Sequence, residues 1–353
     1  RMTELKMAGS ITNFTTTRKN LPAALELVFD AMHNSIMPQD EFDQFKKQMQ
    51  VMIESMRDKP DALAQNAITQ HFNTYPKGDP RYEYSLDESL EQLNKLTVDQ
   101  VRAFYKEFGG TSRGEISIVG DFDPKTVEKI IRDDYAKYVS KAHYAPVVTE
   151  YRPVKATRVV IDTPDKENAI IVARSVFPIN DTAPDAPALT VANWILGGGT
   201  GLSNRLIERL RQKEGLSYGA GSHVRIPAKG DNGSFVFRAI VAPQNMLQAE
   251  ASARDVIAKA IKDGFTDQEV EEAKKGLLQA MQVARSQDDV VARSWNDKME
   301  NQRTWVFSKK QAEAISKLTT ADVNAALRKY IKPDEITFVL AGDQKKAAQK
   351  KQD

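Results

Sequence analysis

The 353-residue chain contains no cysteine, which excludes disulfides, thiolate zinc sites, iron–sulfur clusters and cysteine nucleophiles. Its 50 lysine and arginine residues almost cancel 48 aspartate and glutamate residues, leaving a formal net charge of +2. That balance provides no global electrostatic attraction for nucleic acid or an anionic membrane. No apolar run approaches the roughly 18–20 residues of a bilayer span, so we expect no membrane-spanning segment.

The sequence also lacks the familiar catalytic motifs. Its four histidines, His33, His71, His143 and His223, include no pair at the i, i+4 spacing, so both H-E-x-x-H and H-x-x-E-H are missing. There is no G-x-S-x-G elbow, and the LGGGTG stretch from Leu196 lacks the lysine of a P-loop. We therefore expect no complete zinc site and no nucleotide-binding loop within this chain.

What is present is an internal repeat. With 41% apolar and 28% charged residues, a chain of this length is expected to form two domains with real cores. KLTVDQV at 95–101 matches KLTTADV at 317–323, an offset of 222, and EFDQFKK from Glu41 matches EVEEAKK from Glu269, an offset of 228. In both copies the KLT segment, at 95–101 and at 317–323, is followed by a short helix and then a strand. The repeat therefore predicts one unit made twice.

The two copies differ in length at their beginnings. If the second copy starts near Thr157, it has 112 residues before Glu269, whereas the first has 40 before Glu41. We therefore expect about 72 residues of the first copy to precede Arg1 in a longer protein.

Local patterns predict the fold class. Strand-like stretches occupy 115–120, 157–163, 168–176, 217–226, 234–242 and 335–341. Capping boxes at Ser85, Thr97 and Thr266 mark helix starts between them, and Gly264 marks a helix end. The stretches on either side of Lys229 predict an antiparallel hairpin with Phe235, Phe237, Ala239 and Val241 on one face. The class is therefore α+β, with two similar domains, each a mainly antiparallel sheet with helices on one face, and the first truncated at its N-terminus.

The expected domain boundaries follow from composition. Residues 1–139 are expected to form the truncated, mostly helical first domain. Residues 140–156 contain two prolines and are expected to form a linker. Residues 157–343 are expected to form the complete second domain, and residues 344–353 a basic, solvated tail.

The unusual passage is 196–222, LGGGTGLSNRLIERLRQKEGLSYGAGS. Leu202, Leu206, Ile207 and Leu210 form the apolar stripe of a helix that Gly215 would end. Arg211 would then lie in the last helical turn and Tyr218 just inside the next strand.

Arg211 and Tyr218 are the candidate catalytic residues. A helix-to-strand turn can bring them side by side, where a guanidinium and a phenol could hold a peptide carbonyl and stabilise an oxyanion. The residues alone leave an alternative open, since an arginine at a helix C-terminus interacts with the dipole and a strand tyrosine often only packs.

The passage resembles the C-terminal half of the insulinase/pitrilysin family of zinc metallopeptidases, the inverzincins. In that family a run L-R-x-x-x-x-L-x-Y follows a glycine-rich helix start, and Leu210, Arg211, Leu216 and Tyr218 are in register with it. The resemblance extends over KGDPRYEYSLDESLEQLNKLT, VRAFYKEFGG and GEISIVGDFDP, and is greatest to the second half of long bacterial members exported to the periplasm.

The resemblance implies a specific division of labour. Two halves, each of two α+β domains, would close around an unfolded peptide, and zinc would be bound by H-x-x-E-H and a distant glutamate in the N-terminal half. This chain would supply Arg211 to grip the substrate backbone and Tyr218 to stabilise the oxyanion. Alone it would be inactive and bind no zinc, and a periplasmic or secreted location would suit a cysteine-free chain. The alternative is a non-catalytic scaffold or peptide-binding subunit of the same fold.

Glu54 has a position similar to that of the family's distal zinc glutamate. Lys47, seven residues earlier, occupies a position that is often acidic in catalytic halves. We therefore interpret Glu54 as a solvated helix residue.

Overall fold

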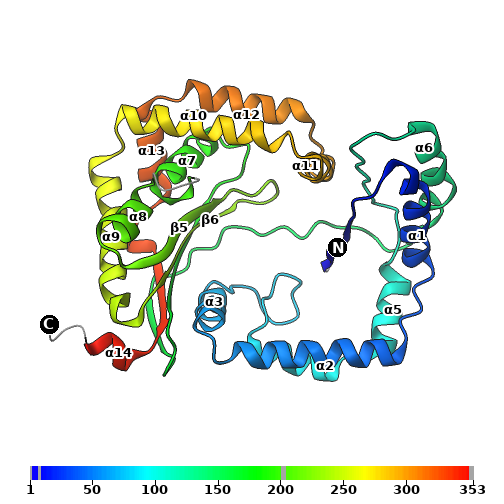
Figure 1. Cartoon of the computed structure of the whole chain (residues 1–353), viewed down its shortest axis with the longest axis horizontal. Helices are drawn as coiled ribbons and strands as arrows, with labels where there is room; N and C mark the ends of the chain where they lie inside the picture. The colour runs from blue at the N-terminus through cyan, green and yellow to red at the C-terminus, as the bar shows by residue number, and fades with distance from the viewer. Residues whose placement is uncertain (1, 7–8, 200–203, 350–353) are drawn as a thin grey trace. The chain divides into compact units, whose positions relative to one another are not determined.

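A computed structural model describes residues 2–6, 9–199 and 204–349, and the chain divides into two units (Figure 1). The first comprises Arg1–Glu54, Asp87–Val147 and Ser286–Gln302; the second comprises Ser55–Leu86, Val148–Arg285 and Arg303–Asp353. This division differs from the sequential one expected, because residues 55–86 belong to the second unit and residues 286–302 to the first.

The duplicated helices are present at the offsets seen in the sequence. Helices α2 (Gln39–Met56) and α10 (Asp267–Ala284) each have 18 residues and start 228 positions apart. Helices α5 (Val98–Phe108) and α13 (Thr320–Tyr330) each have 11 residues and start 222 positions apart. The capping boxes expected at Thr97 and Thr266 are both formed. The repeat is therefore confirmed as a repeat of structure.

The repeat also explains the discontinuous units. Helix α3 (Pro60–His71) and helix α11 (Asp288–Glu300) are equivalent, with starts 228 positions apart. The first-copy helix α3 belongs to the second unit, and the second-copy helix α11 belongs to the first. Each copy therefore contributes the same helix to the unit formed mainly by the other copy.

The second unit is built on a five-stranded sheet in the order β3-β7-β4-β6-β5. The strands are β3 (Arg158–Asp162), β7 (Thr337–Gly342), β4 (Ala169–Pro178), β6 (Asn232–Val241) and β5 (Ser217–Arg225). Only the pairing of β3 with β7 is parallel, so the sheet is mainly antiparallel, as expected. Strands β5 and β6 form the expected hairpin, and β5 is an edge strand.

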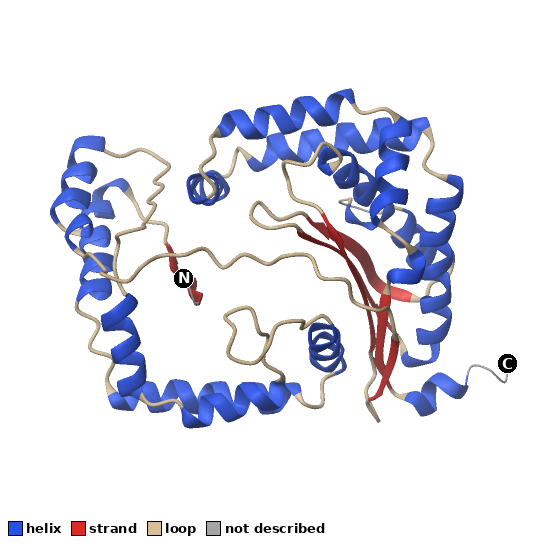
Figure 2. Cartoon of the chain, turned by 180° about the vertical axis from the view of Figure 1, so that it is seen from behind, coloured by secondary structure: helices blue, strands red, loops and turns tan. Residues whose placement is uncertain are grey.

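One face of this sheet carries the main core. Phe235, Phe237, Ala239 and Val241 of β6 are fully buried and belong to one cluster with residues of the covering helices. Because side chains alternate across a strand, these four share one face. Helices α7 (Ala186–Asn193) and α9 (Met246–Asp263) lie in that layer with α10 and α13 (Figure 2). Gly264, with φ +80°, follows α9 as its C-cap, as expected.

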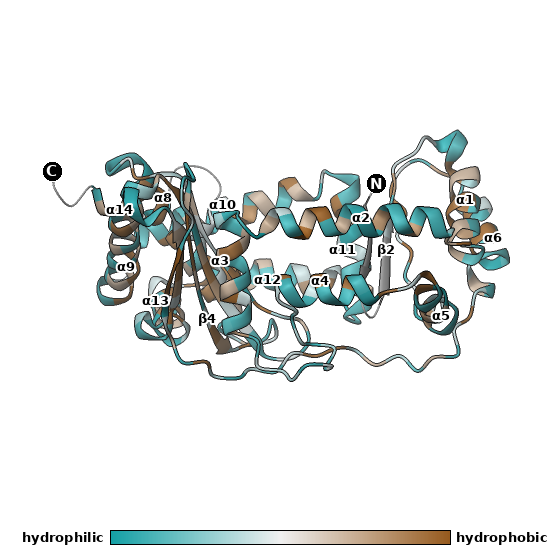
Figure 3. Cartoon of the chain, turned by 90° about the horizontal axis from the view of Figure 1, so that it is seen from below, coloured by the Kyte–Doolittle hydropathy of each residue, from teal (hydrophilic) through white to brown (hydrophobic). Residues whose placement is uncertain are grey.

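The opposite face is covered in part by α3. Ala64 and Ile68 of α3 are buried against Ile170 and Val172 of β4 and Val339 of β7. Strand β4 is therefore apolar on both faces, and its ribbon is largely brown in the hydropathy view (Figure 3). This two-sided burial explains why apolar residues predominate at successive positions of β4, with Arg174 and Ser175 as the exceptions.

The first unit has a smaller core. Leu21, Leu25 and Phe29 of α1 (Leu21–His33) are buried with Val127 of α6 (Pro124–Asp133). The Asp123 carboxylate accepts a hydrogen bond from the Lys125 amide, so it caps α6. The unit also contains the hairpin of β1 (Met2–Lys6) and β2 (Gly9–Asn13) and helix α4 (Leu86–Lys95).

The strand expected at 115–120 is not formed, and that prediction is wrong. Ile116 and Ile118 are half-buried against the α1–α6 core. The residues that the structure describes provide no strand to pair with them, although the equivalent segment of the second copy is β7. An alternating apolar pattern gives a strand only where a neighbour completes the ladder.

The tail also differs from expectation. Residues Gln344–Gln349 form helix α14, and Asp343 caps it by accepting hydrogen bonds from the backbone amides of Lys345 and Lys346, at 2.9 and 3.0 Å. Residues 350–353 of the expected tail lie outside the described residues.

The remaining elements are short helices and connections. They are η1 (Arg18–Asn20), η2 (Tyr135–Lys137), η3 (Trp194–Gly198), α8 (Arg205–Ile207), η4 (Glu208–Lys213), η5 (Pro243–Asn245), α12 (Trp305–Lys317) and η6 (Pro333–Glu335). None of the described helices combines the length and the apolar character that crossing a bilayer requires.

Candidate functional site

The candidate site lies where the chain passes from α7 to β5. Two π-helical stretches, η3 and η4, occur within this passage, with the single turn α8 directly before η4. Single-turn π-helices are rare and frequently occur at functional sites. The sequence predicted one ordinary helix here and gave no signal for the wider turns.

The expected apolar stripe anchors this helix. Leu206 and Leu210 are fully buried in the main core, and Ile207 is half-buried. Leu202, the fourth member of the stripe, lies outside the described residues. The anchoring leaves Arg211, the residue after Leu210, exposed in the last turn.

A tight turn joins η4 to β5. Gly215 has φ +60°, a left-handed conformation that favours glycine and ends helices. The backbone N–H of Leu216 then donates to the carbonyl of Leu210 at 2.8 Å. Because Arg211 follows Leu210 and Tyr218 lies two residues after Leu216, the segments that carry them adjoin at this turn.

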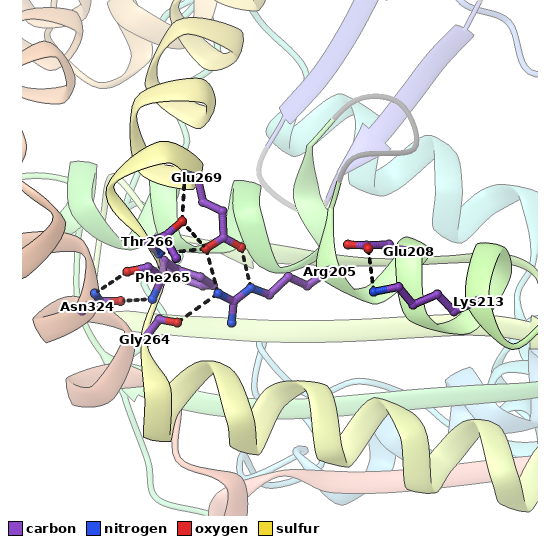
Figure 4. A network of polar contacts seen from close by, with 8 residues as sticks. All are labelled: Arg205, Glu208, Lys213, Gly264, Phe265, Thr266, Glu269 and Asn324. Atoms are coloured by element: carbon purple, nitrogen blue, oxygen red, sulfur yellow. Dashed lines mark hydrogen bonds and ion pairs between the residues drawn. The ribbon is translucent and has the colours of Figure 1, made fainter.

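Arg205 ties the start of this passage to α10 (Figure 4). Its Nε and Nη2 atoms donate to the two carboxylate oxygens of Glu269 at 2.7 and 2.8 Å, and Nη2 also donates to the Gly264 carbonyl at 3.0 Å. The guanidinium lies 4.7 Å from the ring centroid of Phe265, whose backbone is held by Asn324. A bidentate, half-buried pair of this kind fixes direction as well as distance.

The other charged residues of 205–214 are also paired, with one exception. Glu208 bonds Lys213 at 2.8 Å, and Arg209 bonds Glu214. Within the described part of the chain, Arg211 makes no hydrogen bond or ion pair. Its guanidinium is therefore available for a ligand, whereas its neighbours are committed to the fold.

Tyr218 lies at a β-bulge in the edge strand. Ser217 pairs with Val241 and Gly219 with Ile240, so Tyr218 is the extra residue between two registered pairs. The Ser217 hydroxyl holds the bulge by donating to the Ile240 carbonyl at 2.9 Å and accepting from the Gly219 amide at 3.1 Å. The Tyr218 side chain is 67% exposed and has no hydrogen-bond partner among described residues, so it is not a packing residue. Bulges often redirect a side chain beside an active site.

Glycines allow η3 to approach β5 closely. A Cβ placed on Gly197 would lie 2.5 Å from the Ser222 hydroxyl and 2.8 Å from the Ser222 amide nitrogen. The same hydroxyl donates to the Asn193 side chain at 2.8 Å. Gly197 therefore allows η3 to pack closely against β5.

No metal centre is formed by the residues that the structure describes, since they contain no group of three or more histidine, aspartate or glutamate side chains able to hold an ion. His71 bonds the Lys155 carbonyl at 2.9 Å, and His33 packs on Tyr138. Glu54 is exposed on α2.

The Arg205–Glu269 pair makes stability depend on pH. Burial opposes ionisation of Glu269, but hydrogen bonds from Arg205 and Thr266 outweigh it and lower its pKa below the ordinary value of 4.5. A carboxyl group whose pKa is lower in the folded state stabilises the fold at any pH above its unfolded-state pKa. This stabilisation is lost as the pH falls through the folded-state pKa. We expect Glu269→Gln to reduce the free energy of unfolding by about 2 kcal/mol at pH 7, because it loses charge-assisted hydrogen bonds.

The difference between Glu269→Gln and the parent chain should shrink as the pH is lowered from about 5 towards 3. Urea unfolding over this range measures it. The matched control is Glu272→Gln on the same helix, an exposed carboxylate that accepts a hydrogen bond from the Gln268 side chain; this variant should change stability little. A Glu269→Gln difference that stays constant with pH would contradict the assignment.

This chain is similar in sequence to known proteins. Residues 95–277, just over half of the chain, match the family model described as the peptidase M16 inactive domain. A protein of Streptomyces coelicolor named an uncharacterized zinc protease is 24% identical over 277 residues, which cover 76% of this chain and 58% of that protein. The Helicobacter pylori protein named non-peptidase homolog YmxG is 21% identical over 259 residues, which cover 72% and 58%. The chain thus spans a little over half the length of these curated relatives.

Solved structures share the fold. The peptidase M16 inactive domain from Pseudomonas fluorescens superposes with a TM-score of 0.77 at 23% identity, covering 90% of this chain and 74% of that one. The periplasmic protease PqqL from Escherichia coli superposes with a TM-score of 0.63 at 15% identity, covering 92% of this chain and 35% of PqqL. At these identities the likeness establishes the fold, and the expected α+β class is confirmed.

Proposed function

The chain belongs to the peptidase M16 inactive-domain family, and from this premise we propose that it is the non-zinc-binding half of a zinc-dependent metalloendopeptidase. The partner half would carry the metal, and the two would enclose an unfolded peptide. The described residues of this chain do not fit a zinc site, so the ion would be held by the partner half alone. A bound zinc would polarise the scissile carbonyl and activate water.

One observation carries this proposal: Arg211 and Tyr218 are both exposed and have no partners among the described residues, in a segment whose other charges are paired. Arg211 would donate its planar fork of N–H groups to backbone carbonyls of the peptide. The Tyr218 hydroxyl would donate to the oxygen that becomes negative when the carbonyl is attacked. Their segments adjoin at the Gly215 turn, which supports a shared role.

The location we propose is the periplasm or the extracellular space. The chain has no cysteine to oxidise, and the structurally similar PqqL is described as periplasmic. Fractionating cells that express the full-length protein would test this proposal.

The proposed function predicts complementation. The purified chain should show no peptidase activity and no stoichiometric zinc, because the ligands and the activated water belong to the other half. Adding the zinc-binding half should restore both activity, followed with a fluorogenic peptide, and zinc content, measured by elemental analysis. Activity or stoichiometric zinc in the isolated chain would overturn the proposal.

The second candidate is a non-catalytic scaffold or peptide-binding subunit. It is favoured by the similarity to YmxG, which is named a non-peptidase homolog. The reconstitution experiment separates the two functions, because a scaffold would bind the partner half without restoring turnover.

A further inference from the structure

A narrow cleft in the second unit contains an arginine that has no hydrogen-bond partner within the described part of the chain. We call it the Arg174 cleft; its lining includes Phe72, Arg152, Arg174, Val176 and Asn232. Ile170, Val172 and Arg174 are every second residue of β4, so they share one face of the sheet. This face is the one that packs against α3, opposite the main core. The cleft is separate from the residues of the proposed catalytic site, which belong to η4 and β5.

The Nε atom of Arg174 is buried and has no hydrogen-bond partner among the residues that the structure describes. The guanidinium carbon lies 4.8 Å from the centroid of the Phe72 ring. Burial, together with repulsion from Arg225, lowers the pKa of Arg174 from its ordinary value, and the Glu83 carboxylate opposes this shift only in part. The buried Oδ1 of Asn232 also lacks a donor. A donor and an acceptor left unpaired in one cleft are costly, and in native proteins such groups call for an explanation.

Other half-buried arginines of the second unit show what is missing. Arg81 donates twice to the Asp79 carboxylate, at 2.8 and 2.7 Å, and Arg205 donates twice to Glu269. Arg303 does the same with Asp181. In each case the fixed fork of the guanidinium meets a planar carboxylate. Arg174 makes no such pair within the described chain, although the Glu83 carboxylate is near enough to attract it.

The surroundings favour a single negative charge. Arg152 lines the cleft, donates to the Thr74 carbonyl at 2.9 Å and stacks 4.1 Å from the ring of Tyr75, so its charge is held in place. Glu150 also lines the cleft, and Glu83 lies near enough to act on Arg174, so both carboxylates would repel a multiply charged anion. A flat monoanion therefore suits the cleft better than a phosphate dianion.

We propose that the Arg174 cleft binds a carboxylate, and that this carboxylate is the C-terminal end of a peptide. Arg174 donates to the two carboxylate oxygens, while Asn232 Oδ1 accepts the N–H of the last peptide unit, which lies next to the carboxylate-bearing carbon. A side-chain carboxylate offers no such neighbouring donor. The carboxylate site rests on geometry alone, and only its assignment to a peptide depends on the proposed function.

Direct binding to the isolated chain tests this site without any catalysis. The probes are two N-terminally fluorescent Ala/Ser/Gly peptides, identical except that one ends in a free carboxylate and the other in an amide. By fluorescence anisotropy the free acid should bind at least about tenfold more tightly. Sodium acetate should compete, and Arg174→Met should abolish the preference while raising the melting temperature, because an unpaired charge is removed from the interior.

The matched control is Arg238→Met, which lies on the same face of the sheet on β6. Arg238 is already paired with Asp61 of α3 at 2.5 Å, so this variant should keep the preference for the free acid. Equal binding of the acid and the amide, or a preference that survives Arg174→Met, would overturn the carboxylate site.

Two further outcomes separate the parts of the proposal. In the first, acetate raises the melting temperature of the parent chain but not of Arg174→Met, and neither peptide binds. That result would leave a site for small carboxylates and overturn the assignment to a peptide. An amidated peptide containing glutamate that binds as tightly as the free acid would overturn the assignment to the chain end. Neither outcome bears on whether the zinc-binding half restores turnover, so failure here is distinguishable from failure of the proposed function.

Discussion

Replacing Tyr218 with phenylalanine in the enzyme reconstituted with its zinc-binding half is expected to lower peptide turnover about a hundred- to a thousand-fold. The change removes only the hydroxyl that would donate to the developing oxyanion. Because the ring is 67% exposed and lies on a bulge held by Ser217, the fold should lose almost nothing. Steady-state kinetics should show the loss in kcat, while thermal unfolding of the chain stays unchanged.

A buried tyrosine provides the control for this experiment. The Tyr330 hydroxyl donates to the Asp185 carboxylate at 3.0 Å, and its ring is buried in the main core. Tyr330→Phe should therefore reduce stability and leave turnover intact, the reverse of Tyr218→Phe. Unchanged turnover in Tyr218→Phe would return that tyrosine to an ordinary surface role and would favour the scaffold function.

Much of the fold could be predicted because it rests on local periodicity and on the repeat. The alternation of Phe235, Phe237, Ala239 and Val241 placed them on one buried face, and the structure confirms it. Helices α5 and α13 keep the offset of 222 because a capping box, at Thr97 and at Thr319, sets the start of each helix within its own short segment. Signals of this kind act over a few residues, so they can be interpreted without the tertiary structure.

The remaining features depend on contacts between distant residues. The exchange of α3 and α11 between the units places first-copy residues under a second-copy sheet, and nothing in the local pattern of α3 indicates it. The pairing of Arg205 with Glu269 spans 64 positions, and the bulge at Tyr218 depends on the register of β6. Arg174 is a further case, because whether a charge in a buried strand finds a partner depends on the elements packed against that strand.

Leu210→Ala is expected to reduce the free energy of unfolding by about 3 kcal/mol, because it opens a cavity beneath η4. Leu210 is fully buried in the main core, and its carbonyl accepts the Leu216 amide that closes the turn between η4 and β5. Relaxation of η4 into the cavity should displace Arg211, so reconstituted enzyme carrying this variant should also lose turnover at temperatures where it remains folded. Chemical unfolding and peptide kinetics on the same preparation measure the two effects.

Leu327→Ala separates the loss of anchoring from the loss of stability. Leu327 is equally buried in the same core but belongs to α13, away from the turn that joins Arg211 to Tyr218. The two variants should lose comparable stability, because both remove the same atoms from fully buried positions. Only Leu210→Ala should lower turnover, since a displacement of about 1 Å at a positioning group can cost on the order of a hundredfold. Equal turnover in the two variants would mean that the packing of η4 has no part in placing Arg211 against the peptide.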